Sequence, residues 1–157
     1  MKPNPADTAL RTDMMEGRLV LDGFLGDDER PIPEIVWEDE RQLAALGLTV
    51  QDLADAMRAL TRKGIQGMGE PVANGAYTVV TQEYMGFIGC PFKDNRRSAK
   101  RNTTVTNEHG EQFIWSDLGL HLIEAHGFFQ GKGSVYRLEP VPLARFLHLI
   151  KPVVSEE

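Results

Sequence analysis

The sequence predicts an α+β fold, in which a small antiparallel sheet of about 4–5 strands over residues 76–138 packs with an N-terminal helix pair and two C-terminal helices. Two observations lead to this prediction. Apolar residues recur at helical spacing before residue 64, and β-branched and aromatic residues gather in short runs after residue 76. Strands grouped in the middle of a chain, with helices on both sides, favour α+β over a parallel α/β sheet.

The length and composition fit one globular domain. The chain has 157 residues, 41% of them hydrophobic, and a formal net charge of −6. We therefore expect a single domain over residues 17–152. Residues 1–16 show no periodic pattern, so we expect a flexible N-terminal tail there and a C-terminal tail over residues 153–157.

The first predicted helices lie in the N-terminal half. Pro31 and Pro33 predict an extended segment, and a short helix over Glu38–Leu46 comes after it. Thr49 is a predicted N-cap with a carboxylate three residues later, and a second helix then runs to Gly64. Acidic side chains at the start of this second helix oppose DNA phosphates, so we do not favour a DNA-reading helix pair.

Four runs rich in β-branched and aromatic residues come next, and each predicts a strand. They are Tyr77–Thr81, Tyr84–Cys90, Thr103–Thr106 and Gln112–Trp115. A turn-forming sequence over 107–110 joins the last two runs, which predicts an antiparallel meander.

The C-terminal part predicts two further helices. Ser116 is the expected N-cap of a helix over Asp117–His126, and Gly127 is expected to end it in the left-handed conformation. A short strand, Val135–Leu138, is predicted next. Proline in a first helical turn then predicts a last helix over residues 142–150.

The sequence shows no feature of a membrane or secreted protein. The first residues lack the apolar core of a secretory signal, and no apolar stretch approaches the roughly 20 residues that cross a bilayer. The single cysteine, Cys90, excludes an intramolecular disulfide. We therefore expect a soluble cytoplasmic protein with no membrane partner, and pairing of sheet edges could join it into a homodimer.

Charge is divided unevenly along the chain. Residues 1–75 hold 8 basic and 14 acidic side chains, whereas residues 76–157 hold 9 of each. One predicted loop in the second half is strongly basic. Its cations are Lys93, Arg96, Arg97, Lys100 and Arg101, with Asp94 as the acidic exception. Such a loop could bind a small anionic ligand, RNA or an acidic protein partner. Because no nucleic-acid-binding motif accompanies it, nucleic acid is not the favoured partner.

The helix predicted over residues 117–126 carries candidate catalytic groups. Asp117, His121 and Glu124 fall on one stripe, so Asp117 could orient the ring of His121 and raise its basicity. His126 lies about 140° from His121 around the helix, so we expect that a regular helix cannot direct both rings to one ion. We expect His126 to pack in the core or to cap the helix carbonyls.

Cys90 lies at a predicted strand end, just before a proline. The basic loop could lower its pKa, with His121 as the base and Asp117 as the orienting group. A small buried thiol with a packing role is the favoured interpretation.

A zinc or iron site would have to combine Cys90, His109, His121 and either His126 or Asp94. These spacings match no familiar ligand pattern, and His109 belongs to a turn. We therefore assign no metal ligand, and the cofactor stays unknown.

The leading hypothesis is a small cytosolic binding or regulatory module with an unknown ligand. Its site would combine Cys90–Arg101, Asp117–Glu124 and Gly131–Arg137, with Lys132 and Arg137 as further ligand-binding cations. The glycine-rich part of the last segment comes after a helix and lacks the Walker spacing, which argues against nucleotide hydrolysis. The alternatives are a thiol- or metal-dependent hydrolytic enzyme that uses Cys90 and His121, and RNA or phosphate binding through the basic loop.

Overall fold

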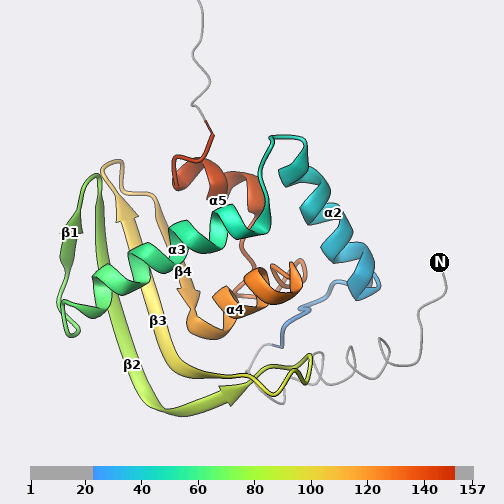
Figure 1. Cartoon of the computed structure of the whole chain (residues 1–157), viewed down its shortest axis with the longest axis horizontal. Coiled ribbons are helices and arrows are strands. Elements are labelled where there is room, and N and C mark those ends of the chain that lie inside the picture. Colours follow the sequence, from blue (N-terminus) through green and yellow to red (C-terminus); the bar gives the residue numbers. More distant parts are fainter. Residues whose placement is uncertain (1–22, 151–157) are drawn as a thin grey trace, which may run out of the picture.

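The computed structural model describes residues 23–150, so both predicted tails lie outside the described residues. The short strand Val72–Asn74 was not predicted and the predicted strand Val135–Leu138 is absent; otherwise the helices and strands follow the predicted order. They are α2 (Ile32–Ala44), α3 (Val50–Ile65), β1 (Val72–Asn74), β2 (Tyr77–Gly89), β3 (Arg97–Asn107), β4 (Gln112–Ser116), α4 (Asp117–His126) and α5 (Pro140–Phe146). The predicted α+β class is confirmed, and within the described residues α3 and α4 pack against the sheet (Figure 1).

The sheet is an antiparallel meander with the strand order β1-β2-β3-β4. Its long strand β2 joins two runs that the sequence separated, Tyr77–Thr81 and Tyr84–Cys90. β3 begins at Arg97, so the prediction of a loop over Lys93–Arg101 is wrong for its second half. Residues 97–101 form a strand because they pair with the far end of β2, a long-range contact that their polar side chains do not reveal.

A bulge divides β2 into two parts. Tyr84 pairs with Lys100 and Phe87 pairs with Ala99, so Met85 and Gly86 are extra residues on β2. A bulge bends its strand and increases the local twist. Figure 1 shows β2 and β3 curving together and continuing beneath α4, which brings the turn between them to that helix.

Local sequence explains the helix boundaries, with one correction. Thr49 and Asp52 form the predicted capping box at the start of α3. α2 begins at Ile32, six residues before the predicted start, because Pro31 serves as its N-cap residue and Pro33 occupies the first turn. Proline is compatible with that position since the first amides of a helix have no partner within it.

The C-terminal part matches the prediction less closely. Ser116 caps α4, and Gly127 ends it in the left-handed conformation with φ 64°. Val135–Leu138 is not a strand; turns replace it, and Arg137 there binds the buried carboxylate of Asp39. α5 covers Pro140–Phe146, shorter and earlier than predicted.

Buried side chains form two clusters. The larger core cluster joins α3, the sheet, α4 and α5 around Trp115 and Phe129. The smaller core cluster joins residues 24–25, α2 and α4, and its members include Cys90 and Phe128. Within residues 23–150, no helix has the length and apolar composition that crossing a membrane requires.

Candidate metal centre

The turn between β2 and β3 is held in a tight conformation. The amide of Cys90 donates to the carbonyl of Arg96 at 3.0 Å, and the amide of Lys93 donates back to the carbonyl of Cys90 at 3.0 Å. Asp94 Oδ1 accepts from the amide of Arg96 at 2.9 Å. Lys93 and Asn95 have positive φ angles of 58° and 64°. This folding of the backbone lets Cys90 and Asp94 present their side chains to the same helix.

That helix is α4, which carries both histidines. His121 Nε2 lies 2.7 Å from Asp94 Oδ2, and His126 Nε2 lies 2.8 Å from the same oxygen. The expectation that a regular helix cannot direct both rings to one point is therefore wrong. The Cβ atoms of the two histidines point in different directions around the helix. Nε2, however, is the ring atom farthest from Cβ, so rotation of the side chains can bring the two Nε2 atoms together. His126 is the last residue of α4, so no further helical turn blocks its ring.

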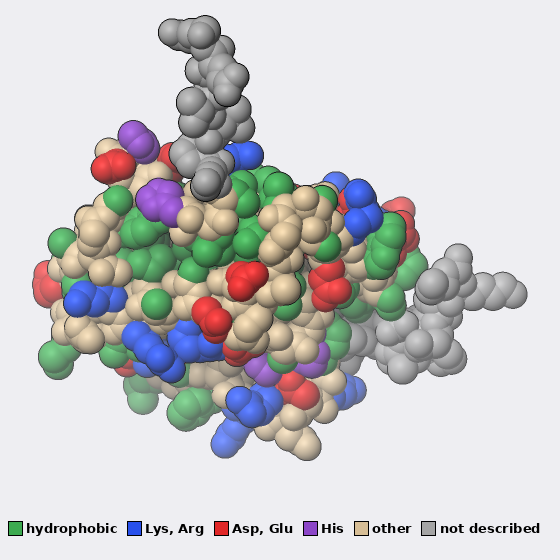
Figure 2. Space-filling model, turned by 45° about the horizontal axis from the view of Figure 1, so that its top comes forward, with side chains coloured by type: hydrophobic (Ala, Val, Ile, Leu, Met, Phe, Trp, Pro, Cys, Tyr) green, Lys and Arg blue, Asp and Glu red, His purple; other side chains and the backbone are tan. Residues whose placement is uncertain are grey.

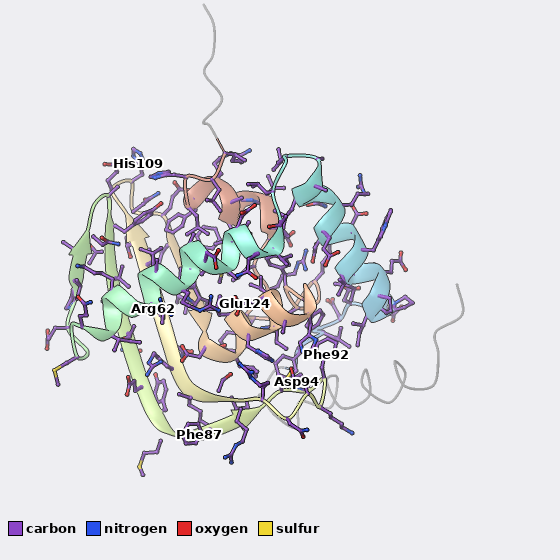
Figure 3. All side chains as sticks on the ribbon, in the orientation of Figure 1. Arg62, Phe87, Phe92, Asp94, His109 and Glu124 are labelled. Carbon is purple, nitrogen blue, oxygen red and sulfur yellow. The ribbon has the colours of Figure 1, made fainter. Side chains whose placement is uncertain are left out.

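Phe92 completes the surroundings of His126. The two rings are stacked, with centroids 4.1 Å apart and an angle of 12° between their planes. Phe92 also meets Phe128 edge-on in the smaller core cluster. His126 is thus held from the side by an aromatic residue of the β2–β3 turn, and it does not cap the helix carbonyls, which Gly127 covers (Figure 3 shows Phe92 and Asp94 near the end of α4).

Cys90 is the fourth member of the group. Its Sγ lies 3.6 Å from His126 Nε2, and the residue is 7% exposed. We call Cys90, Asp94, His121 and His126 the four-residue cluster. Their ligand-forming atoms all lie within 4.8 Å of one another. Two elements far apart in the sequence therefore bring a thiol, a carboxylate and two imidazoles to one point.

The electrostatics of the cluster differ between its two acidic groups. Burial, together with the nearby charge of Asp94, raises the pKa of the Cys90 thiol to about 11. Burial would also raise the pKa of Asp94, but hydrogen bonds from Arg96 and from both histidines outweigh it and hold that pKa well below its ordinary value. The surroundings thus keep a carboxylate charged and a thiol protonated, which does not favour Cys90 as a free nucleophile.

The spacing of the side chains is close to that of a tetrahedral zinc site, except at Asp94. Zinc bonds of about 2.0–2.3 Å separate neighbouring ligand atoms by about 3.3–3.8 Å. The distance of 3.6 Å from Cys90 Sγ to His126 Nε2 already falls in this range. The two contacts to Asp94 Oδ2, at 2.7 and 2.8 Å, would have to lengthen by about half an ångström to one ångström. A small movement of one carboxylate would create the space.

Asp117 has a different partner from the one expected. Its Oδ2 accepts from Arg101 Nη1 at 2.6 Å, and its other oxygen is buried without a partner among the described residues. Arg101 also binds Glu83 on β2. Asp94 takes the place beside His121 that the sequence indicated for Asp117. Burial raises the pKa of Asp117, although the charge of Arg101 opposes that shift.

The third predicted segment of the site lies with other partners. Arg137 forms a buried ion pair with Asp39 of α2 and also binds Glu139. The amide of Lys132 donates to Asp28 at 3.0 Å. His109 is exposed in the turn between β3 and β4. The predicted segment Gly131–Arg137 therefore contacts the N-terminal segment and α2, and His109 lies in a surface turn, so neither joins the site. The other two predicted segments, Cys90–Arg101 and Asp117–Glu124, do meet.

The basic residues of the predicted loop line a groove beside the cluster. It has a volume of about 410 Å³ and lies between α3, β3 and α4. Arg96, Arg97 and Arg101 contribute to it from the turn and β3, and His121 from α4. Figure 2 shows a group of Lys and Arg side chains in the lower half of the molecule, next to histidines. Lys93 and Lys100 are not among its lining residues.

The convergence of Asp94 and His126 at this point was not expected from the sequence, although a pattern could have indicated it. Cys90-x₃-Asp94 with His121-x₄-His126 farther along the chain has the spacing of Cys-x₂₋₄-Cys and His-x₃₋₅-His zinc ligands, with aspartate in place of the second cysteine. Comparisons with protein-family models, curated proteins and solved structures found no match to this chain. The functional argument therefore rests on the geometry.

Proposed function

We propose that this chain is a zinc-stabilised binding module, in which one Zn²⁺ held by Cys90, Asp94, His121 and His126 ties the β2–β3 turn to α4. The observation that carries the proposal is the four-residue cluster, with all four ligand atoms within 4.8 Å of one another. A thiolate and two imidazoles favour zinc over calcium or magnesium, which prefer oxygen ligands.

The number of ligands favours a structural role for the metal. Structural zinc sites use four protein ligands, whereas catalytic sites keep one position for water or substrate. A zinc ion would also change the protonation of the cluster. A coordinating thiol is deprotonated by the metal, and each histidine would present a bare Nε2 instead of sharing a proton with Asp94.

This role suits the fold around the turn. Residues 90–96 are held by a few backbone hydrogen bonds and by packing on the smaller core cluster. A metal that binds the folded state alone would fix the turn and the start of β3, and with them the arginines of the groove. The ligand-binding surface of the module would then be this groove, where the predicted site segments Cys90–Arg101 and Asp117–Glu124 meet.

The experiment is metal analysis of purified protein after reconstitution with zinc and removal of excess metal. We expect one zinc per chain in the wild type. Loss of a residue that only supports a ligand typically lowers metal affinity by about 10–100-fold. Cys90→Ser and His126→Ala each remove a proposed ligand itself, so each should lower zinc affinity by at least this factor. His109→Ala removes an exposed histidine outside the cluster and should retain zinc as the wild type does.

Cobalt provides a second measurement, since Co²⁺ occupies tetrahedral zinc sites and a bound thiolate gives a near-ultraviolet charge-transfer band. The band should appear in the wild type and in His109→Ala and should be absent from Cys90→Ser. Wild-type protein without stoichiometric zinc after reconstitution, or Cys90→Ser with wild-type zinc affinity, would contradict the proposal.

A further inference from the structure

The groove beside the four-residue cluster has a marked excess of positive charge. Five arginines and two acidic residues line it. The arginines are Arg58, Arg62, Arg96, Arg97 and Arg101, and the acidic residues are Asp117 and Glu124. Thr61 and Ser98 add hydroxyl groups that can bind an oxyanion. An anionic ligand is therefore the occupant that complements this surface.

Internal ion pairs neutralise only some of these arginines. Arg58 pairs with Glu124, and Arg101 pairs with Asp117. Arg62 and Arg96 have no acidic side-chain partner within residues 23–150. The guanidinium of Arg97 lies 5.7 Å from the centroid of the Phe87 ring. Three guanidinium groups on two different elements are thus available to a ligand, and the planar donors of arginine suit phosphate oxygens.

Large exposed side chains lie next to this charge on β2. Tyr84 is 56% exposed and Phe87 is 66% exposed. Tyr84 pairs across the sheet with Lys100, and Phe87 lies beneath Arg97 at the bend of the strand (Figure 3). A strand of a soluble protein has no packing reason to expose two aromatic rings flanked by cations, whereas unpaired bases stack on such rings.

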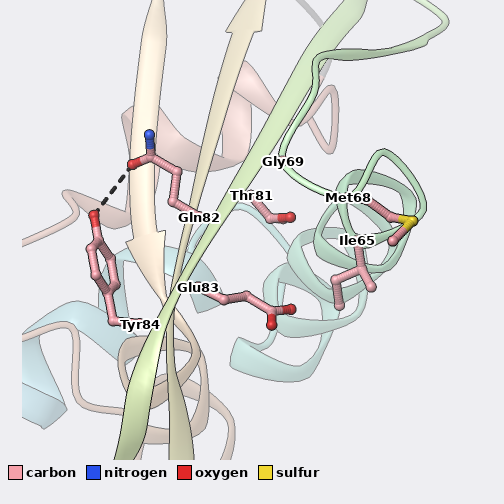
Figure 4. A pocket seen from close by; sticks show the side chains of 7 residues that line it. All are labelled: Ile65, Met68, Gly69, Thr81, Gln82, Glu83 and Tyr84. Carbon is pink, nitrogen blue, oxygen red and sulfur yellow. Dashed lines mark hydrogen bonds between the residues drawn. The ribbon is translucent and has the colours of Figure 1, made fainter.

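The surface continues beyond the arginine groove. Ile65 lines both this groove and a second pocket of about 610 Å³. Met68, Glu83 and Tyr84 also line that pocket, which lies at the unpaired edge of β2. Figure 4 shows Glu83 on the same side of the strand as Ile65 and Met68, and Tyr84 on the other side. A ligand that runs from the arginines past Ile65 and then crosses the unpaired edge of β2 would reach Tyr84, and it would be longer than a single phosphate group.

We propose that single-stranded nucleic acid binds along this surface, with phosphates on Arg62, Arg96 and Arg97, one base stacked on Phe87 beside Arg97, and the strand crossing the unpaired edge of β2 to stack a further base on Tyr84. The inference rests on the proposed function in one respect, because the zinc site would fix Arg96 and Arg97 beside α4. Positive charge together with exposed aromatic rings is the combination by which proteins bind single strands without reading sequence.

The test measures fluorescence anisotropy of a labelled mixed-sequence oligonucleotide of about 12 nucleotides, as DNA and as RNA, between about 50 and 200 mM salt. Arg62→Gln/Arg97→Gln should weaken binding and flatten the slope of log affinity against log salt by about 1.4, since each phosphate contact on a single strand contributes about 0.7. Lys132→Gln/Arg145→Gln removes the same charge from exposed residues outside the groove and should retain the wild-type slope.

The aromatic residues need their own variant. Tyr84→Ala/Phe87→Ala should weaken binding roughly fivefold or more for each stacked base while the salt slope stays unchanged. Both side chains are exposed, so the fold does not depend on them. If the arginine variant loses affinity and the aromatic variant does not, the ligand is a phosphate group alone and the inference is wrong.

The outcome separates the two proposals. Zinc content is measured on each variant, and all of them should hold zinc, since none removes a cluster residue. Wild-type protein that holds zinc but does not bind either oligonucleotide at about 50 mM salt overturns the nucleic-acid inference and leaves the metal site standing. Oligonucleotide binding with the expected variant effects, in protein that holds no zinc, supports the inference and overturns the metal site.

Discussion

Asp28 is a buried carboxylate that donors surround. It is 6% exposed, and it accepts hydrogen bonds from the guanidinium and amide of Arg30 and from the amide of Lys132. Burial alone would raise the pKa of Asp28, but these hydrogen bonds outweigh it and hold that pKa well below its usual range. The charged form of Asp28 therefore stabilises the contact between the 23–30 segment and the glycine-rich turn.

This linkage predicts a pH dependence. A carboxylate with a depressed folded-state pKa stabilises the protein fully above its unfolded pKa, 3.8 for Asp28, and the contribution is lost as the pH falls below it. Asp28→Asn should lower the free energy of unfolding by about 2 kcal/mol near neutral pH, since it removes charge-assisted hydrogen bonds. The difference from the wild type should shrink below about pH 4. Urea unfolding at several pH values measures it.

Asp27→Asn is the matched control, because it neutralises the adjacent carboxylate, which is exposed. A stability difference for Asp28→Asn that stays constant from neutral pH to about pH 3 would show that charge is not the cause.

Single residues also show the limit of sequence-based prediction. The burial of Cys90 and the position of His109 in a turn were expected, and the turn results from local sequence. The convergence of His121 and His126 on Asp94 was missed. Angles around a helix describe where Cβ atoms point, whereas ring nitrogens lie several bonds farther out. The position of Asp94 depends on a turn 27 residues away from His121.

At the scale of elements, the end of α4 depends on a glycine. Gly127 has φ 64°, and a Cβ atom there would overlap the Glu40 carboxylate of α2. This glycine comes directly after His126, so its conformation determines how closely the end of α4 approaches α2. The left-handed conformation favours glycine, and any other residue would also have to displace the Glu40 side chain.

Gly127→Ala should therefore destabilise the protein by roughly the 1 kcal/mol that a left-handed alanine costs, together with the smaller cost of displacing the flexible end of the Glu40 side chain. Gly47→Ala is the control. Gly47 also has a positive φ, 74°, after a helix, but no atom lies within 4 Å of the position of its added Cβ. Thermal or urea unfolding of both variants measures the difference. Equal losses of stability would mean that the contact with Glu40 has no cost.

The success of element prediction depends on the range of the interactions involved. The caps of α3 and α4 were predicted because a cap is formed within a few residues. The start of β3 was not, because Arg97 and Lys100 are polar and join the sheet through pairing with β2. The start of α2 was missed because proline at a helix start and proline in an extended segment look the same in sequence.

At the scale of the whole molecule, the two core clusters are built from different elements. The larger core cluster includes α3 and three of the strands. The smaller core cluster contains eight buried residues, among them Cys90, and lies under the turn that carries Asp94. The overall class and the order of the helices were predictable from sequence, whereas the short strand β1 and this division into two clusters were not. The division depends on how the bent hairpin folds under α4.

Removal of the proposed zinc ion should consequently loosen one part of the protein more than the other. In hydrogen exchange, a chelator should speed exchange of amides in the 90–98 turn and at the end of α4, where the proposed zinc ligands lie. Amides in the middle of α3 should keep their protection, because the larger core cluster covers them. Cys90→Ser should show the same pattern without a chelator. Equal acceleration at all amides would contradict independent opening of the smaller cluster.

The bulge in β2 has a consequence for the behaviour of the protein at high concentration. β1 pairs only with Tyr77–Val79, so from Val80 onward the outer side of β2 has no strand partner among the described residues. An unpaired edge is a template on which other chains can assemble into fibrils. Met85 and Gly86 end the regular stretch Val80–Tyr84 and bend the remainder of the strand. A straight incoming strand can match only Val80–Tyr84, so the irregularity also acts as protection against aggregation.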